Sequence, residues 1–431
     1  MTSAPADLTV HLEPPPGWVQ IPQEPDAEGA VLLALAPADW REDWGVRPNI
    51  VVGLGAPTTG TIRAVATRTA ATFLALEAGH RIVSWDLWHD EGGRRLLVTY
   101  PAGTALVAAM TWVRLEGGRP LSVTATVDAD RYLRVMPLMM QAVDTLRVEG
   151  TVPEHSAPPV PAAEPADEPR TDDFWSGRGE TLEDLGRLQQ AQPWAPDGLP
   201  LSRAAFAAFA EAGRGLRGPR VKDRSAVEEL QQAGLVDASG RLTEDGRTTH
   251  AALAGADRRI RVESAAAGVP GTFEAARLGD TALVWATDPP SRWAGGPARG
   301  RDALESATTG TLQWIPLMHL PEELAAWLQV GPAWPMATSP PRLPRDLVTE
   351  RAEDDRVPPP PDADDHLRSA WAEPWFTWVL TTDTGHAVAG VHAGRHGHFR
   401  LAEPEEQDGV VDLQAFPSEP LFTTLVGASL L

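Results

Sequence analysis

The chain has 431 residues, and its 59 Asp and Glu outnumber its 37 Lys and Arg, so that the formal net charge is −22. This length predicts two or three domains, each large enough for a hydrophobic core. No part of the chain is strongly basic, which disfavours a protein built to neutralise nucleic-acid phosphates, and the absence of cysteine excludes disulfides, thiolate catalysis and cysteine-based metal centres.

The N-terminal residues contain no basic segment followed by an apolar run, which is the pattern of a signal peptide. No stretch of about 18 apolar residues predicts a membrane-spanning helix. We therefore expect a cytoplasmic protein that does not insert into membranes.

Residues 1–150 predict an α+β domain. Apolar residues three and four apart indicate helices over 58–79, with Gly79 as the C-cap, and over 129–146. Seven segments have the alternation or the β-branched and aromatic content of strands, bounded by Gly, Pro or Asp: 8–14, 30–38, 49–55, 81–90, 94–102, 105–115 and 121–127. These elements favour a mostly antiparallel sheet covered by two helices.

Four stretches of this domain form a recognisable set: Pro16-Gly17-Trp18 after an opening strand, the strand 30–35, the run Arg47-Pro48-Asn49-Ile50-Val51-Val52, and the run Asp144-Thr145-Leu146-Arg147-Val148. The set resembles the LpqN/PsbP-like family of small actinobacterial domains, over about a third of the chain. The resemblance implies a binding or docking module, because this family shares no catalytic residues. Its members are often lipoproteins or secreted proteins, whereas this sequence shows no exported leader and no cysteine for lipidation.

A segment rich in Pro, Ala and acidic residues, 151–174, separates this domain from the rest of the chain. It shows no hydrophobic periodicity, which is typical of an extended, solvated linker. A similar segment, 340–365, contains four consecutive prolines that favour polyproline II. We interpret it as a long loop or disordered insertion within a second domain, 175–431.

Residues 230–255 of the second domain predict a helix end, a tight two-stranded turn and a second helix, which is the pattern of a winged-helix DNA-binding protein. Five acids against two arginines between 225 and 255 disfavour contact with phosphates. We expect this stretch to serve packing or protein recognition. A winged-helix transcriptional regulator that uses 224–255 stays as an alternative.

Strands followed by a helix occur twice in this domain, over 256–331 and 371–431, which suggests a degenerate internal duplication. The apolar patterns that carry a further likeness are 230–253, 279–286, 311–316 and 420–431. They resemble the EspG-type chaperones of type VII (ESX) secretion, whose quasi-symmetric fold pairs a central sheet with helical bundles. The resemblance implies binding of a helical secreted substrate, and it transfers no individual contact residue.

Three clustered histidines, His392, His396 and His398, are candidate metal ligands. His396 and His398 would share one face of a strand, and His392 would meet them across a Gly-rich turn. Positions in turns and at the surface explain these histidines equally well, so we expect no metal. An enzyme built around the cluster is an alternative. No phosphate loop and no nucleophile elbow occur, and neither catalysis nor a cofactor is expected.

Four of the sixteen tryptophans are candidate contacts to a protein partner. Trp40 and Trp44 lie in a polar stretch rather than in an apolar run. Trp85 and Trp88 would point to opposite faces of one strand, so we expect one of them to point outward. Local packing at the sheet edge explains them as well.

The sequence therefore predicts an α+β protein of two domains, each a mostly antiparallel sheet covered by helices, joined by a Pro/Ala/acidic linker. We expect a non-enzymatic cytoplasmic chaperone or adaptor that binds a helical type VII secretion-type substrate and neither nucleic acid nor cofactor. A further alternative is an envelope-associated or small-molecule-binding protein that acts through the PsbP-like domain.

Overall fold

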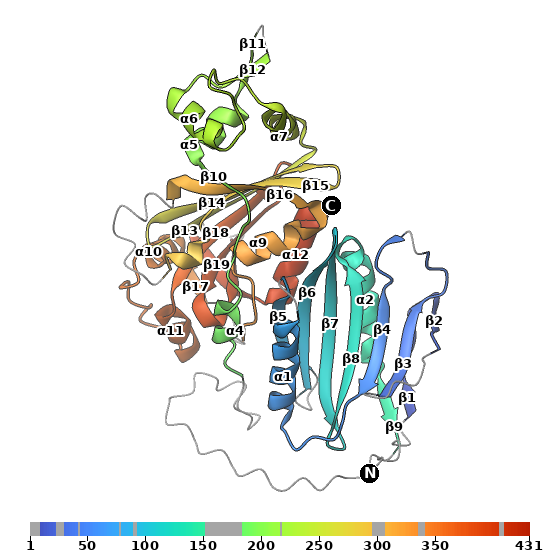
Figure 1. The fold of residues 1–431 in the computed structure, drawn as a ribbon. Helices are drawn as coiled ribbons and strands as arrows, with labels where there is room; N and C mark the ends of the chain where they lie inside the picture. Colours follow the sequence, from blue (N-terminus) through green and yellow to red (C-terminus); the bar gives the residue numbers. More distant parts are fainter. Residues whose placement is uncertain are drawn as a thin grey trace. The chain divides into compact units, whose positions relative to one another are not determined.

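A computed structural model describes residues 9–22, 30–41, 44–76, 79–88, 93–150, 183–215, 218–294, 307–334, 341–404 and 409–431. The chain divides into two compact units, Met1–Leu188 and Gln189–Leu431, and each has its own antiparallel sheet and helices (Figure 1). The predicted α+β class is therefore confirmed. The predicted linker, 151–174, lies outside the described residues.

In the first unit, the described residues form a seven-stranded antiparallel sheet, whose strands fall largely where the sequence predicts them. Its order is β2 (Trp18–Gln20), β3 (Ala30–Pro37), β4 (Asn49–Leu54), β8 (Arg119–Asp128), β7 (Ala105–Glu116), β6 (Gly93–Ala102) and β5 (Arg81–Trp88). A separate pair joins β1 (Thr9–His11) to β9 (Arg147–Glu149).

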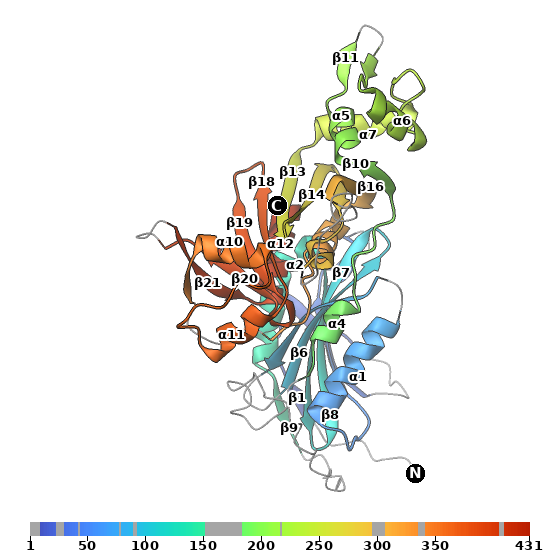
Figure 2. The same cartoon turned by 90° about the vertical axis from the view of Figure 1, so that its left-hand side faces the viewer.

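Two helices cover this sheet from opposite faces (Figures 1 and 2). The helix α1 (Ile62–Ala75) packs on β5, β6 and β7, and α2 (Ala129–Asp144) packs on β7 and β8. Residues 106–113 of β7 are all buried, as expected for a strand with both faces covered. The side chains of Thr61 and Asp128 accept a backbone N–H bond in the first turn of each helix, which stabilises the two helix starts.

The end of α1 differs from the prediction. The helix stops at Ala75 with Leu76 as its C-cap, so the predicted cap at Gly79 is wrong. Gly79 has a φ of 100° immediately before β5, and a Cβ there would lie 2.9 Å from Pro101. The glycine therefore serves the entry to the strand rather than the end of the helix.

A buried ion pair ties the end of the first unit to its sheet. Arg94 Nε on β6 donates to Glu183 Oε1 at 2.9 Å, and both side chains are almost fully buried. Buried charges persist in proteins when they are paired and hydrogen-bonded. The residues around Glu183 are thus part of the folded unit rather than of a linker.

In the second unit, the described residues form a ten-stranded antiparallel sheet. Its order is β10 (Leu199–Ser202), β16 (Thr309–Pro316), β15 (Thr281–Thr287), β14 (Val269–Leu278), β13 (Arg258–Ala266), β18 (Trp375–Thr382), β19 (Ala387–Ala393), β20 (His398–Ala402), β21 (Val410–Phe416) and β17 (Arg342–Pro344). A small hairpin pairs β11 (Gly213–Gly215) with β12 (Gly218–Arg220).

The helices of this unit lie near its sheet, apart from one at its start. Near the sheet they are α5 (Arg203–Ala210), α6 (Arg224–Gln232), α7 (Glu244–Gly255), α9 (Leu320–Trp327), α10 (Arg345–Glu353), α11 (Asp365–Ala372) and α12 (Ser418–Leu430). The short α4 (Gly186–Gln190) spans the division between the units. Within the described stretches, every helix is too short or too polar to span a bilayer.

Two halves of the same topology make up the ten-stranded sheet. In each half, four strands form a meander, β13 to β16 or β18 to β21, and a helix follows, α9 or α12. An edge strand, β10 or β17, pairs with the last strand of its meander, and the halves join through β13 and β18. The last strands carry matching sequences, Leu312-Gln313-Trp314-Ile315-Pro316 and Leu413-Gln414-Ala415-Phe416-Pro417. This arrangement agrees with the predicted internal duplication.

The helices divide between the two faces of this sheet. On one face α9 packs against α12, and the ring centroids of Phe273 and Trp327 lie 5.8 Å apart. On the other face α5, α6 and α7, the first lobe, cover outer strands of the first half. The helices α10 and α11, the second lobe, cover strands of the second half, and α10 also contacts the central strands β18 and β13. The two lobes have separate cores.

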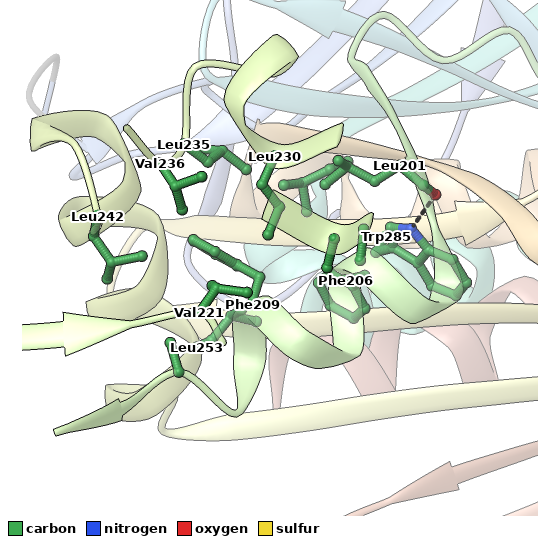
Figure 3. Packing of buried hydrophobic residues seen from close by; sticks show 14 of the residues in the cluster. Leu201, Phe206, Phe209, Val221, Leu230, Leu235, Val236, Leu242, Leu253 and Trp285 are labelled. Carbon is green, nitrogen blue, oxygen red and sulfur yellow. Dashed lines mark hydrogen bonds between the residues drawn. The ribbon is translucent and has the colours of Figure 1, made fainter. Parts of the chain in front are cut away.

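The first lobe is built around Trp285 (Figure 3). The ring of Phe206 stacks on Trp285 with centroids 5.0 Å apart, and Trp285 Nε1 donates to the carbonyl oxygen of Leu201 at 3.2 Å. The predicted helix, turn and helix over 230–255 are confirmed, because α6 ends at Gln232, a bridge joins Val236 to Leu242, and α7 follows.

The interpretation of 340–365 as a long loop or disordered insertion is wrong. The segment contains the edge strand β17 and the helix α10, and α11 begins at its last residue. Leu343, Val348 and Ala352 are buried in the core of the second lobe. The many acids and prolines of the segment indicate a loop, but the burial of these three apolar residues stabilises an ordered strand and helix.

Arg351 fixes this segment to the sheet. Its side chain is buried, and its guanidinium donates three hydrogen bonds, to the carbonyl oxygen of Trp371 at 3.1 and 2.8 Å and to that of Glu373 at 2.7 Å. Burial lowers the pKa of this guanidinium from its usual value. Trp371 and Glu373 lie at the end of α11, just before β18 begins. The side chain of Arg351 on α10 therefore joins α10, α11 and the start of β18.

We predict that Arg351→Ala lowers the free energy of unfolding by about 3 kcal/mol, because it leaves buried carbonyl groups without donors and opens a cavity. Arg356→Ala is the matched control. Arg356 is exposed and pairs with Asp354 beside it, so its loss should cost less than about 0.5 kcal/mol. Urea unfolding followed by tryptophan fluorescence measures both variants, and equal losses would contradict the role of Arg351.

Candidate functional site

The two central strands of the second unit, β13 and β18, have one face that is only partly covered. The helix α10 packs on this face at the end of β13 near Ala267 and at the start of β18 near Trp375, and the remainder of the face is exposed. Buried and exposed residues alternate along β13, with Ile260 and Val262 inside and Arg261 and Glu263 outside. The same alternation runs along β18, where Val379 and Thr381 are exposed. By contrast, β15 is buried on both faces along most of its length. Strict alternation marks a strand with one solvated face.

Cross-strand pairing places the exposed residues on one surface. Arg261 pairs with Glu274 on β14 and with Thr381 on β18, and Glu263 pairs with Val379. Directly paired residues point to the same face of a sheet. The surface, called the central strip below, consists of Arg259, Arg261, Glu263, Glu274, Val379 and Thr381.

The central strip lies between the two lobes. Trp285 and Glu274 are direct partners, so the face that packs on the first lobe is the face of the strip. Val391 pairs with Thr377 on β18 and packs in the core of the second lobe, which places that lobe on the same face. The strip is therefore an uncovered floor with a helical wall on each side.

A shallow pocket of about 180 Å³ opens at the edge of the strip beside the first lobe. Phe206, Leu253, Ala276 and Leu283 supply apolar walls, and the remaining lining residues include Arg259, Arg261 and Glu274 of the strip. A cavity of about 150 Å³ accommodates a benzene ring. The pocket thus has room for one large apolar side chain, with charged groups around it.

The charges of the strip are partly balanced within the strip. The guanidinium of Arg261 lies 2.7 Å from Glu263 and 3.5 Å from Glu274. Both Arg261 and Glu263 are solvent-exposed, and exposed pairs of this kind hold each other weakly. Val379, with 41% of its surface exposed, lies directly opposite Glu263 as an apolar contact point. The strip combines a weakly held ion pair with an exposed apolar side chain.

The structure buries two of the four tryptophans proposed as partner contacts. Trp85 is 1% exposed and Trp88 is 5% exposed, so the expectation that one of them points outward is wrong. The helix α1 packs against β5, and the guanidinium of Arg114 lies 5.4 Å from the Trp88 ring. Both faces of this edge strand are therefore covered, which strand alternation alone does not reveal.

Trp40 and Trp44 lie together in the first unit. Their rings meet edge to face with centroids 5.5 Å apart, and Arg131 lies 4.8 Å above the Trp40 ring. Trp44 keeps 41% of its surface exposed. Their contact with each other and with Arg131 accounts for their position in a polar stretch. Their use by a partner stays a prediction.

The three candidate metal ligands are placed differently from the prediction. His396 does not share a strand face with His398, because it lies in the tight turn Gly394–His396, where its Nε2 bonds to Ser369 Oγ at 2.9 Å. His392 and His398 face each other across β19 and β20, with ring centroids 4.7 Å apart. Among the residues that the structure describes, no three His, Asp or Glu side chains are grouped to hold a metal ion.

The imidazoles of this cluster are bonded in their neutral form. Gln189 Nε2 lies 2.8 Å from His392 Nε2, and Trp378 Nε1 donates to His398 Nδ1 at 3.1 Å. Burial lowers the pKa of His398 to about 3 and that of His396 to about 4. These histidines are thus buried packing residues that tie the meander β18–β20 together.

The sequence predicts one property of the central strip, the polar face of β13, but not its position between two lobes. The alternation of Arg259, Arg261 and Glu263 with apolar residues predicts a strand with one polar face. Nothing in the sequence indicates that β13 pairs with β18, more than a hundred residues later, or that the lobes leave part of this pair exposed. The strip is therefore not among the residues that the sequence singles out.

We predict acid destabilisation that depends on these histidines. Unfolding restores the ordinary pKa of about 6.5, so the unfolded chain takes up protons that the folded chain does not, and stability falls as the pH drops from about 6.5 toward 4. Each buried histidine should contribute a loss of about 2 kcal/mol at pH 5. His398→Phe should reduce the difference in unfolding free energy between pH 7 and pH 5.

The exposed His386 provides the control, because His386→Gln should leave the pH dependence of the wild type unchanged. Urea unfolding at several pH values measures all three proteins. An unaltered pH dependence in His398→Phe would contradict the assignment.

The sequence matches no protein-family model, and no curated protein is found to be similar to it. Among solved structures, the chain is similar to LpqN of Mycobacterium tuberculosis, which is described as involved in cell envelope biogenesis. The two sequences are 18% identical, the match covers 33% of this chain and 85% of that chain, and the TM-score is 0.27. It is also similar to the PsbP protein (CyanoP) from Synechocystis sp. PCC 6803, with 14% identity, 35% and 98% of the two chains covered, and a TM-score of 0.24. Both names belong to the family that residues 1–150 resemble, and at these TM-scores the likeness carries no argument about function.

Proposed function

We propose that the chain is a cytoplasmic chaperone or adaptor whose second unit binds a helical segment of a type VII secretion-type substrate. The observation that carries the proposal is the central strip, an uncovered part of a sheet between two helical lobes. This sheet surface is exposed between two lobes that cover its neighbours, whereas the nearby strand β15 is buried on both faces along most of its length.

The dimensions of the strip suit a helix. Four adjacent strands, β14, β13, β18 and β19, contain the strip, and the two lobe cores reach the outer members of this set through Ala276 of β14 and Val391 of β19. Neighbouring strands lie about 4.8 Å apart, so these four strands span about 14 Å. A helix with its side chains is about 10–12 Å wide. One helix therefore fits along the floor, whereas a second sheet would collide with the lobes.

The chemistry of the floor suits an amphipathic helix. Val379 and the pocket beside Leu283 offer apolar contacts to one stripe of such a helix. Arg261 and Glu263 pair only weakly with each other, so each is available to a partner charge of opposite sign. Apolar contacts at the centre and charges around them are the usual anatomy of a protein interface.

The resemblance to EspG-type chaperones supports the same proposal. It implies a quasi-symmetric domain with a central sheet and helical bundles, and the second unit has duplicated halves around the β13–β18 pair. The sequence motifs indicate neither a nucleophile nor a cofactor site, in keeping with a binding role. The proposal assigns no reaction to the chain.

We predict that Val379→Arg abolishes recovery of the helical secretion substrate when the tagged protein is purified from its native host. The new side chain removes the apolar contact and fills the floor, while Glu263 opposite it keeps the strand pair compatible with a positive charge. Val19→Arg is the matched control, because Val19 lies on a strand of the first unit with a similar exposure of 46%.

Mass spectrometry of the recovered proteins measures the effect, and thermal unfolding confirms that both variants are folded. Recovery should be unchanged with Val19→Arg and at least about tenfold lower with Val379→Arg, since central interface residues contribute about 2 kcal/mol or more. Equal recovery with both variants, or a wild-type protein that recovers no helical secretion substrate, would contradict the proposal.

A further inference from the structure

The first lobe carries a second surface, which does not belong to the central strip. The stretch from Gly213 to Arg224 contains five basic residues and one acid, in a chain whose net charge is −22. Three of the basic residues, Arg220, Lys222 and Arg224, are exposed in the structure. Arg241, exposed as well, lies directly opposite Arg220 in an antiparallel bridge. These four residues are called the basic ridge below.

The fold holds the basic ridge together by its backbone. Val221, between Arg220 and Lys222, is buried in the lobe core, and its N–H donates to the carbonyl oxygen of Gly240 at 2.9 Å. Gly240 has a φ of 78°, and a Cβ there would lie 2.6 Å from the carbonyl oxygen of Val221. The turn must therefore approach β12 closely, which brings two arginines face to face. Like charges placed directly opposite each other repel, so this pairing does not stabilise the lobe.

The acids nearest to the basic ridge are occupied by the backbone. Asp237 Oδ1 accepts the N–H groups of Ser239 and Arg241, at 2.8 and 3.0 Å, and thereby shapes the turn. Asp223 caps α6 by accepting the N–H groups of Ser225 and Ala226. In the part of the chain that the structure describes, none of the four ridge residues forms a direct ion pair, although Arg220 Nε donates to the carbonyl oxygen of Ser239 at 2.7 Å. The hydrogen bond from the Ser239 side chain and, to a smaller extent, the charge of Arg241 lower the pKa of Asp237. Exposed arginines elsewhere in this unit do form ion pairs, such as Arg342 of β17 with Asp412 of β21.

We infer that the basic ridge binds an acidic segment of a partner protein. Guanidinium groups match carboxylates in bidentate geometry, and Arg220 and Arg241 extend two such groups from directly paired backbone positions. A carboxylate placed between them would remove the repulsion that the fold leaves in place. Electrostatic complementarity of this kind favours encounter and orientation of a partner. The inference is independent of the proposed use of the central strip.

The surroundings favour an acidic peptide over a nucleic acid. Glu228, Glu244 and Asp245 are exposed on the same lobe, and they limit the positive surface to a short ridge. A duplex carries one charge about every 1.7 Å over its whole length, so it would extend beyond the ridge to these acids. A short acidic segment places its charges on the ridge alone.

The experiment uses the full-length protein and a fluorescein-labelled dodecaglutamate peptide. Fluorescence anisotropy measures binding at about 0.02 M salt, where surface charges are poorly screened. The wild type should bind the peptide, and Lys222→Glu/Arg241→Glu should bind it at least about tenfold more weakly. The control Arg368→Glu/Arg400→Glu makes the same change of charge at exposed sites outside the lobe and should change the affinity less than about twofold.

Lys222→Gln/Arg241→Gln separates loss of charge from loss of folding, because it should show an intermediate affinity with an unchanged thermal unfolding midpoint. A wild type that does not bind the peptide, or equal losses in the ridge and control variants, would overturn the inference. A mixed-sequence DNA duplex that binds the ridge more tightly than the peptide would also overturn it, in favour of a nucleic-acid surface.

Discussion

The antiparallel pairing of β13 with β18 is the constraint on which the second unit depends. This pairing joins two meanders into one sheet and places their first strands at its centre. Each lobe precedes the first strand of its own meander in the chain, yet it packs mainly over the later strands, and α10 reaches only one end of β13 and β18. On the face of the lobes, the part of this pair that stays exposed consists of Arg259, Arg261 and Glu263 on β13 and of Val379 and Thr381 on β18. The central strip is thus a result of the topology, and the duplication accounts for its position between two similar walls.

Local patterns were enough to predict most elements, because strand alternation and helical periodicity are properties of short stretches. Most strands of the first unit and the helix–turn–helix over 230–255 agree with their predictions, whereas the short strands β2 and β9 were not predicted. Errors arose where long-range burial overrides local composition. Leu343, Val348 and Ala352 order a segment whose acids and prolines indicate a loop, and the coverage of both sheet faces buries Trp85 together with Trp88.

The candidate site was harder to predict than the fold for the same physical reason. A strand with one polar face is recognisable from Arg259 to Glu263, but its role depends on a partner strand far away in the sequence. The histidines illustrate the converse. Their spacing indicates a shared strand face, whereas a turn diverts His396 to Ser369 and leaves His392 and His398 as a buried pair. Spacing predicts proximity only where the backbone is regular.

The two surfaces of the second unit differ in how their charges are satisfied. In the central strip, Arg261 has acidic neighbours at 2.7 and 3.5 Å, so its charge is balanced although loosely held. In the basic ridge, the acids at hand shape turns and cap a helix instead. A balanced floor suits a helix of mixed charge, and an unbalanced ridge suits an acidic segment. One partner that has both a helix of mixed charge and an acidic segment would occupy the central strip and the basic ridge together. Two separate partners would occupy one surface each.

Site-specific photo-crosslinking tests the central claim most directly. A photoreactive amino acid at position 379 in the native host should join the protein to a helical segment of a secreted substrate, and the crosslinked peptides identify that segment by mass spectrometry. The same amino acid at position 19, which has a similar exposure, should not capture that segment. Capture of the segment from position 19 alone, or of no helical partner from position 379, would contradict the assignment of the central strip as the binding surface.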